Sequence, residues 1–430
     1  MSGLRIVDDD LLKCGLRLPG VRRRANALAQ LPPLGLLTIA GCVERSWSIE
    51  FVDDDGSSDK QAITERIVRT RPDVVAFSTL TPAADRAAAI AEQLSAHQIH
   101  TIVGGLHATA TPGWCQSRFD SVGAGDGESI FSEMLDDWKS NRLASLYRPA
   151  RSADLSESPM PRWDLWKRAD APRFTIQTMR GCPWGCQFCA ASRLLGPARA
   201  KPDQQIIDEI RYVGQRQQRP WIELADDNTF ACHREAGPWL DVLRETKAKW
   251  FTESDWLIGR RPHLLARIAA SGCRQILIGL ESPIHRFPGM GGKAGSWEEV
   301  IKCVNAIQSA GIAVNACFIV GVDGETPDTI DALSRYLSTA PFAEIQVTLQ
   351  TPFPGTKLYD QMKADDRLLF HNFERYTLFD VTYQPDAMSV ETLRRSFRNL
   401  VRQVYSNAAT SRRTKIARQI AQIRRSRQCV

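Results

Sequence analysis

The chain has 430 residues, enough for two or three domains, and its 43% apolar and 24% charged residues are typical of a folded globular protein. Its apolar runs, such as residues 34–40, are shorter than the roughly 20 residues that span a bilayer. Residues 1–10 carry three acids and no apolar core of a signal peptide. We therefore expect neither a membrane span nor secretion, and we expect a cytoplasmic protein.

The net charge of +6 is concentrated at the C-terminus. Residues 391–430 contain eleven Lys or Arg and one acid, a net charge of +10. The other 390 residues contain 44 basic and 48 acidic side chains, a net charge of −4. The main body is thus mildly acidic, and the whole-chain charge does not indicate nucleic-acid binding.

Residues 1–140 alternate between expected strands and helices. Apolar runs predict strands at 48–52, 73–78 and 101–103, and helical patterns predict helices at 63–70, 83–96 and 129–137. This alternation is typical of an α/β domain with a parallel, Rossmann- or flavodoxin-like sheet that binds ligands at the carboxyl ends of its strands. Residues 141–172 contain four prolines and many polar residues, which indicates a linker.

Residues 173–357 form a second alternating series. Strands are expected at 174–179, 221–224, 250–253, 275–279, 313–320 and 344–350, with helices at 204–215, 239–246, 263–270, 297–310 and 327–339. Six strand–helix repeats predict a partial (β/α)6 barrel of the TIM type. Its functional residues should lie at the C-terminal ends of the strands.

Residues 358–430 are expected to be a small helical segment with a basic tail. Apolar residues at helical spacing predict a helix that packs on the barrel: Leu393, Phe397, Leu400, Val401 and Val404. Residues 411–427 have seven basic side chains and no acid. We interpret this run as a solvated or frayed tail, with a docking surface for an acidic partner or the substrate as the alternative.

Three of the eleven cysteines lie together, directly after the first strand of the second series. Cys182, Cys186 and Cys189 have the spacing C-x3-C-x2-C. Zinc sites usually have four ligands in paired knuckles, and no partner pair lies nearby. Three thiolates on one loop suit a [4Fe–4S] cluster with one iron left open for a small chelating molecule. The alternative is that the three cysteines are incidental core residues.

This loop and its setting resemble the radical S-adenosylmethionine (SAM) superfamily. The resemblance continues in segments that follow successive strands, namely 224–230, 278–282, 318–326 and 349–356. It implies that the open iron binds SAM and that one-electron reduction of SAM gives a 5′-deoxyadenosyl radical. It also implies that SAM is contacted by Phe188, Asp226, Asp227, Glu281 and Gly321.

The first domain resembles the cobalamin-binding module that often precedes such barrels. The resemblance implies a cobalamin site built from small and polar residues at strand ends: Ser78, Leu80, Thr81, Gly104, Gly105, Gly123 and Gly125. The Asp-x-His-x-x-Gly segment that supplies a cobalt ligand in other cobalamin proteins has no counterpart between Val7 and Gly35. His97, His100 and His107 are interpreted as surface or turn residues. We therefore expect cobalamin to bind without a protein histidine, with a vestigial site as the alternative.

The resemblance as a whole implies a cobalamin-dependent radical SAM methyltransferase that acts on an unactivated carbon of a small, natural-product type molecule. Its electron donor would be a flavodoxin or ferredoxin. A second hypothesis keeps the cofactors but not the methyl transfer: ring formation, oxidation, or transfer of the aminocarboxypropyl group of SAM. A third, from another class, is a non-catalytic iron–sulfur protein.

Overall fold

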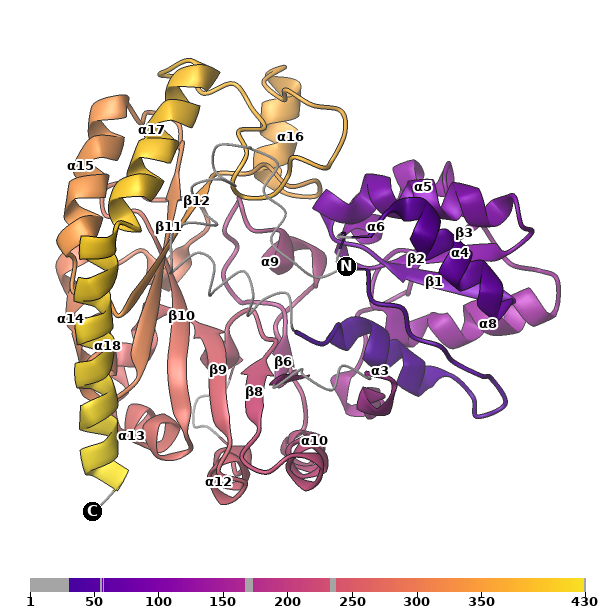
Figure 1. Cartoon of the computed structure of the whole chain (residues 1–430), viewed down its shortest axis with the longest axis horizontal. Coiled ribbons are helices and arrows are strands. Elements are labelled where there is room, and N and C mark those ends of the chain that lie inside the picture. The colour runs from indigo at the N-terminus through magenta and orange to yellow at the C-terminus, as the bar shows by residue number, and fades with distance from the viewer. Residues whose placement is uncertain (1–30, 55, 57, 167–172, 233–236, 429–430) are drawn as a thin grey trace.

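The structure is a computed structural model that describes residues 31–54, 56, 58–166, 173–232 and 237–428. It has an N-terminal α/β domain, a larger barrel-like domain and a C-terminal helical segment on the barrel's outer side (Figure 1). Among the described residues, no helix is long and apolar enough to cross a membrane.

The first domain is built on a parallel sheet of four strands in the order β1-β2-β3-β4. The strands are β1 (Val74–Ser78), β2 (His100–Gly104), β3 (Ser121–Gly123) and β4 (Leu146–Tyr147). Val103 packs toward α5 and its neighbour Ile102 toward α8, so helices cover both faces, as strand alternation requires. The helices are α3 (Leu34–Cys42), α4 (Lys60–Thr70), α5 (Ala84–Ser95), α6 (Leu106–Ala110), α7 (Pro112–Gln116) and α8 (Phe131–Lys139).

The strand expected at residues 48–52 is wrong. This segment is irregular, and a cavity of about 390 Å³ lies between it and β1, lined by residues of both. Parallel strands exchange hydrogen bonds only when they lie about 4.8 Å apart. Among the described residues, no strand pairs with residues 48–52. Strand β4 lies inside the expected linker, so the first sheet extends further along the chain than its pattern indicated.

The second domain is a partial barrel of six parallel strands that are neighbours in space in chain order. All six expected strands are present: β5 (Arg173–Ile176), β8 (Trp221–Leu224), β9 (Lys249–Ser254), β10 (Cys273–Glu281), β11 (Ala313–Val320) and β12 (Glu344–Leu349). Because every pairing is parallel, the six carboxyl ends meet at one mouth.

Helices surround the barrel sheet and enclose its core with it. They are α10 (Asp203–Arg216), α11 (Thr229–Cys232), α12 (Trp239–Glu245), α13 (Pro262–Ala270), α14 (Trp297–Ser309) and α15 (Pro327–Thr339). Ser296 and Thr326 begin α14 and α15 with capping boxes, which explains why these boundaries were readable from the sequence. The fully buried Trp239, Trp250 and Trp256 supply much of the apolar surface in this core.

A small antiparallel hairpin flanks the cysteine loop. Strands β6 (Met179–Arg180) and β7 (Arg199–Ala200) pair with each other, and the chain between them contains the three cysteines and the short helix α9 (Ala190–Leu194). The hairpin therefore closes residues 181–198 into a loop with a defined neck.

The C-terminal segment contains α16 (Lys357–Ala364), α17 (Val390–Val404) and α18 (Asn407–Gln428). The apolar stripe expected on α17 is buried, as predicted. The tail is not frayed, because α18 is a helix whose Arg413 and Ile420 are buried. Most side chains of residues 411–427 are exposed, as the interpretation of a solvated run expected. Helices α17 and α18 lie on the side of the barrel away from the first domain (Figure 1).

Residues 353–376, which we call the crossing segment, return from the barrel to the first domain. Phe373 and Tyr376 are buried in an apolar cluster with Ala84 and Trp114. The backbone N–H of Phe373 donates a hydrogen bond to the carboxylate of Asp85 at 2.6 Å. The two domains are thus joined by the crossing segment as well as by the chain between β4 and β5.

Candidate active site at the barrel mouth

The cysteine loop leaves the neck of the hairpin at the barrel mouth. Cys186 is buried, Cys182 and Cys189 are half-buried, and all three are free thiols. Gly181 has a φ of +78°, and a Cβ there would lie 2.8 Å from the carbonyl oxygen of Gly196. Only glycine satisfies both conditions, so this position lets the loop turn tightly out of its neck.

A glycine-rich segment, residues 285–296, packs over the cysteine loop. The N–H of Gln187 donates to the carbonyl of Pro288 at 3.1 Å, and the rings of Phe188 and Phe287 meet edge to face at 4.9 Å. Cys186 lies in the same small apolar cluster as Phe287 and Met290. This packing buries Cys186 and partly shields Cys182 and Cys189 from bulk water.

The thiols fit a cluster better than a single metal ion. In the described part of the chain, no three His, Cys, Asp or Glu side chains converge closely enough to hold one ion. Zinc would need its thiolates about 2.3 Å from one centre, whereas a [4Fe–4S] cube is held through separate irons. Burial raises the pKa of Cys186 to about 11, with Cys189, Glu281 and Cys182 raising it further and Lys293 lowering it. The cysteines therefore share one electrostatic environment.

Asp226 is buried beneath this loop and accepts four hydrogen bonds. Oδ1 accepts from the N–H groups of Thr178 (2.7 Å) and Met179 (3.1 Å), and Oδ2 from the hydroxyls of Thr178 (2.6 Å) and Thr229 (2.7 Å). This geometry favours a role in positioning the chain that enters the neck. The expected contact between Asp226 and SAM stays a prediction that competes with this role.

Asp227 and Asn228 reach the cysteine loop itself. The N–H of Gly181 donates to Oδ2 of Asp227 at 3.1 Å, and the Asn228 amide lies 3.8 Å from Sγ of Cys182. The same amide donates to Asp255 at 2.9 Å, and Asp255 also accepts from the indole of Trp184 at 2.8 Å. The ends of β8 and β9 thus support the loop through one connected polar network.

Glu281 is the last residue of β10 and has the backbone conformation of a functional site. A one-residue bulge precedes it, and its φ is +62°, which is rare for a residue with a side chain. Its carboxylate accepts from Nζ of Lys293 at 2.9 Å. Although burial alone would lower the pKa of Lys293, Glu281 and then Cys186 raise it, so the ammonium stays charged beside the thiols.

Lys293 is a candidate site residue that the sequence reasoning missed. Its side chain is almost fully buried, although it belongs to the glycine-rich segment. The available signal was a lysine among four closely spaced glycines, Gly289, Gly291, Gly292 and Gly295. A cation in this position suits an anionic group of a ligand at the barrel mouth.

Gly321 follows β11 at the same mouth. It has a φ of +86°, its N–H donates to Oε2 of Glu325 at 2.6 Å, and its carbonyl accepts from the hydroxyl of Tyr383. Burial raises the pKa of Glu325 to about 7, although the N–H groups of Gly321 and Val322 lower it. The other oxygen, Oε1, lies 3.6 Å from Nε2 of His285. The structure therefore brings Gly321 to the mouth beside Glu281, Asp227 and the cysteine loop.

The expected cobalamin residues also gather at one edge, the carboxyl end of the first sheet. Ser78 and Gly104 end neighbouring strands in register. Gly105 has a φ of +95°, and a Cβ there would also crowd Thr79 and Ser78. Leu80 is 53% exposed, the hydroxyl of Thr81 lies 3.4 Å from Nδ1 of His107, and the buried hydroxyl of Thr79 has no partner among the described residues.

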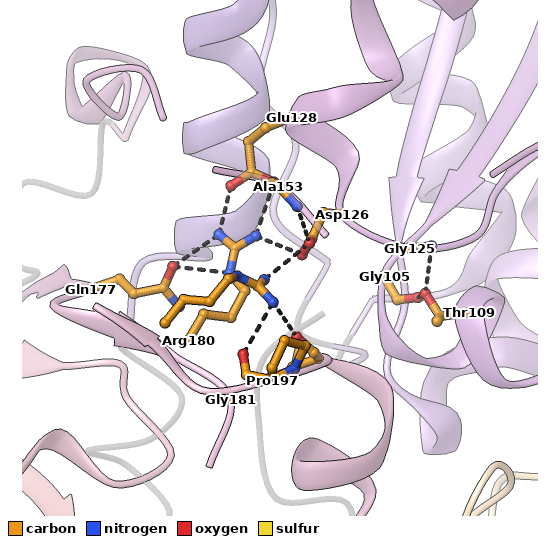
Figure 2. Close-up of polar contacts among 12 residues, drawn as sticks. Gly105, Thr109, Gly125, Asp126, Glu128, Ala153, Gln177, Arg180, Gly181 and Pro197 are labelled. Carbon is orange, nitrogen blue, oxygen red and sulfur yellow. Dashed lines mark hydrogen bonds and ion pairs between the residues drawn. The ribbon is translucent and has the colours of Figure 1, made fainter. Parts of the chain in front are cut away.

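This edge fits a large cofactor that has both amide groups and an apolar face. An unpartnered buried hydroxyl offers a hydrogen bond, and a surface leucine beside it offers an apolar contact. Gly123 ends β3, and Gly125, with a φ of +133°, donates from its N–H to the hydroxyl of Thr109 at 3.0 Å. Thr109 in turn donates to the carbonyl of Gly105 at 3.0 Å and so joins the two glycine turns (Figure 2).

The interpretation of His107 as a surface or turn residue is wrong. Its side chain is fully buried between the rings of Trp114 and Phe373, and burial lowers its pKa to about 4. Its imidazole contacts the hydroxyls of Thr81 and Thr111. His107 therefore packs the domain seam as a neutral residue. Most of the segment between Val7 and Gly35, where a ligand histidine was sought, lies outside the described residues.

Comparison with known proteins identifies both halves of this arrangement. Residues 176–337 match the family model Radical SAM superfamily, and residues 23–135 match the B12 binding domain. The chain therefore combines a B12-binding domain with a radical SAM domain. The radical SAM domain implies SAM and a [4Fe–4S] cluster, and the B12-binding domain implies cobalamin.

Named relatives of this radical SAM enzyme include two methyltransferases. An uncharacterized methyltransferase of Pyrococcus horikoshii is 26% identical over 385 residues, which cover 81% of this chain and 82% of the relative. The bacteriochlorophyllide d C-12(1)-methyltransferase of Chlorobaculum tepidum is 23% identical over 393 residues, 89% of this chain and 84% of the relative.

A solved structure shares the fold. The cobalamin-dependent SAM radical enzyme OxsB, with aqua-cobalamin bound, aligns with a TM-score of 0.66 at 15% sequence identity. The alignment covers 85% of this chain and 63% of OxsB, so the present chain spans less than two thirds of that protein. The individual residues that hold each cofactor stay predictions.

Proposed function

We propose that this radical SAM enzyme transfers a methyl group from SAM to an unactivated carbon of a small molecule. The observation that carries the proposal is a contact between the two cofactor sites: Arg180, at the neck of the cysteine loop, forms ion pairs with Asp126 and Glu128 of the 123–128 loop at the cobalamin edge, the shortest at 2.5 Å. The names of the two methyltransferase relatives support methyl transfer, and bacteriochlorophyllide d, which one of these names contains, supports a small-molecule substrate.

In this proposal Cys182, Cys186 and Cys189 hold the cluster, and the cobalamin edge holds the corrinoid. When bound, the cluster supplies the electron that splits SAM into methionine and a carbon radical, and cobalamin supplies the methyl group. Leu80 and the hydroxyls of the cobalamin edge would contact the corrinoid without a histidine below the cobalt. A flavodoxin or ferredoxin would deliver the electron.

The chain's own residues bind SAM and exclude water. Lys293 places a buried positive charge where the SAM carboxylate can bind, and Glu281 offers a carboxylate for its amino group. The aromatic contact between Phe188 and Phe287 covers the site, which protects a reactive radical from stray hydrogen donors. Holding both cofactors and substrate at one mouth supplies the proximity that the transfer needs.

The test needs no known substrate. The reconstituted enzyme, with hydroxocobalamin, SAM and a strong reductant, is incubated without oxygen, and the SAM-derived products are quantified. Formation of both S-adenosylhomocysteine and 5′-deoxyadenosine supports methyl transfer. Formation of 5′-deoxyadenosine without S-adenosylhomocysteine contradicts methyl transfer, and methylthioadenosine indicates cleavage of the bond that releases the aminocarboxypropyl group. Cys186→Ser is the matched control and should abolish 5′-deoxyadenosine.

A further inference from the structure

Two arginines face each other at the neck of the cysteine loop. Arg180 of β6 and Arg199 of β7 are direct cross-strand partners in the hairpin that closes residues 181–198. Like charges directly opposite each other destabilise a strand pair. Both side chains are largely buried, at 12% and 17% exposed, so water screens their repulsion poorly. The neck therefore needs negative charge from elsewhere.

The first domain supplies that charge. Asp126 accepts from Arg180 at 2.8 Å and from Arg199 at 3.0 Å, and Glu128 accepts from Arg180 at 2.5 and 3.1 Å (Figure 2). Asp126 is 9% exposed and Glu128 12%. Two buried acids thus neutralise two buried bases across the domain boundary. We call these four residues the interdomain ion cluster.

Each side of the interdomain ion cluster is attached to a cofactor loop. Arg180 is separated from Cys182 only by Gly181, and Arg199 also donates to the carbonyls of Leu195 and Pro197 at 3.1 Å, which fixes the returning end of the loop. Asp126 directly follows Gly125, whose position is held by Thr109. Moving either loop would leave buried charges without partners, and removing one partner of a buried pair is strongly unfavourable.

We propose that the interdomain ion cluster couples the loading of the two cofactors, so that each one, when bound, raises the affinity for the other. Ordering the cysteine loop around the iron–sulfur cluster fixes the neck arginines, which hold Asp126 and Glu128 in place and so preorganise the cobalamin edge. Coupling between two binding sites is reciprocal, so cobalamin must stabilise the cysteine loop by the same factor. The four side chains are positioning residues, and the inference rests on the proposed cobalamin site.

The test measures a ratio of affinities. Hydroxocobalamin is titrated, by its absorbance change and without oxygen, into the full chain with and without a reconstituted iron–sulfur cluster. In the wild type, reconstitution should lower the Kd at least about fivefold, the lower end of typical coupling. In Asp126→Asn/Glu128→Gln the ratio should fall below about twofold. By the same factor, hydroxocobalamin should increase the retention of iron by the reconstituted protein in the presence of a chelator.

A matched control separates coupling from general damage. Asp54 and Arg86 form a similarly buried, bidentate ion pair within the first domain. Its two hydrogen bonds are 2.7 and 2.9 Å long, and the side chains of Asp54 and Arg86 are 11% and 13% exposed. Asp54→Asn should keep the wild-type ratio. If the double variant unfolds, Arg180→Lys is tested instead. This variant keeps the positive charge but cannot form bidentate hydrogen bonds, so it should give an intermediate ratio.

Three results would overturn the proposal: a wild-type ratio of one, an unchanged ratio in the double variant, or an absence of hydroxocobalamin binding in both wild-type forms. None of them depends on whether a methyl group is transferred. Failure of the coupling can therefore be told apart from failure of the proposed reaction.

Discussion

Replacing Asp226 by alanine should detach the cysteine loop from its support, whereas replacing it by asparagine should not. In Asp226→Ala the N–H groups of Thr178 and Met179 lose their acceptor in a buried site. Each stranded donor costs about 1–3 kcal/mol, so the free energy of unfolding should fall by about 2–6 kcal/mol. In Asp226→Asn the amide oxygen still serves both N–H groups while the amide donates to the hydroxyls of Thr178 and Thr229, and the loss should be about 1 kcal/mol. Burial raises the pKa of Asp226, so a neutral amide is a conservative replacement.

The assay combines urea unfolding of the iron-free protein with the iron-to-protein ratio after anaerobic reconstitution. Asp226→Ala should lower both, and Asp226→Asn should keep the iron ratio near the wild-type value. Asp120→Ala is the matched control, because Asp120 likewise accepts from the N–H and hydroxyl of one threonine, Thr101, but in the first domain. It should weaken folding and leave the iron ratio unchanged. If both Asp226 variants kept their stability and iron but bound SAM more weakly, the carboxylate would contact SAM and the positioning role would be refuted.

Three further outcomes are expected. Lys293→Met should weaken SAM binding at least about tenfold in equilibrium dialysis. It should also destabilise the protein by about 3–5 kcal/mol, because it leaves Glu281 buried without its partner. Adding Glu281→Gln should restore part of that stability but not the affinity for SAM. Glu325 has a pKa of about 7 in the folded protein, against 4.5 for an ordinary glutamate. The stability that its bound proton provides should therefore be lost as the pH rises from 4.5 to 7. Glu325→Gln should flatten the pH dependence of the urea midpoint over this range. Leu80→Glu should weaken hydroxocobalamin binding without lowering the unfolding midpoint, since the side chain is 53% exposed; unchanged binding would place the corrinoid elsewhere.

The barrel was largely predictable from the sequence because its signals are local. Strands buried on both faces are continuous apolar runs, and boundaries such as Pro327 after Thr326 carry capping residues. The order of chemical residues after successive strands placed Glu281, Gly321 and the cysteines at one mouth, because parallel strands bring their carboxyl ends together.

The remaining features depend on partners far away in the chain. His107 is buried because Phe373 of the crossing segment covers it, and no local pattern reports that contact. The segment at 48–52 has strand composition, but no described strand pairs with it. The sequence around Asp126 is typical of a turn, and the ion pair of Asp126 with Arg180 forms only when the two domains meet. Such roles follow from tertiary contacts and not from propensity.

The crossing segment has a consequence for how the molecule can move. The chain connects the two domains before the barrel, and the crossing segment contacts the first domain again after it. The hydrogen bond from Phe373 to Asp85 anchors this second connection. Two domains connected at two separate points cannot rotate freely about a single hinge. A large cofactor would then enter by local movement of loops while the two domains keep their spacing. A single proteolytic cut in either connection would leave the domains associated.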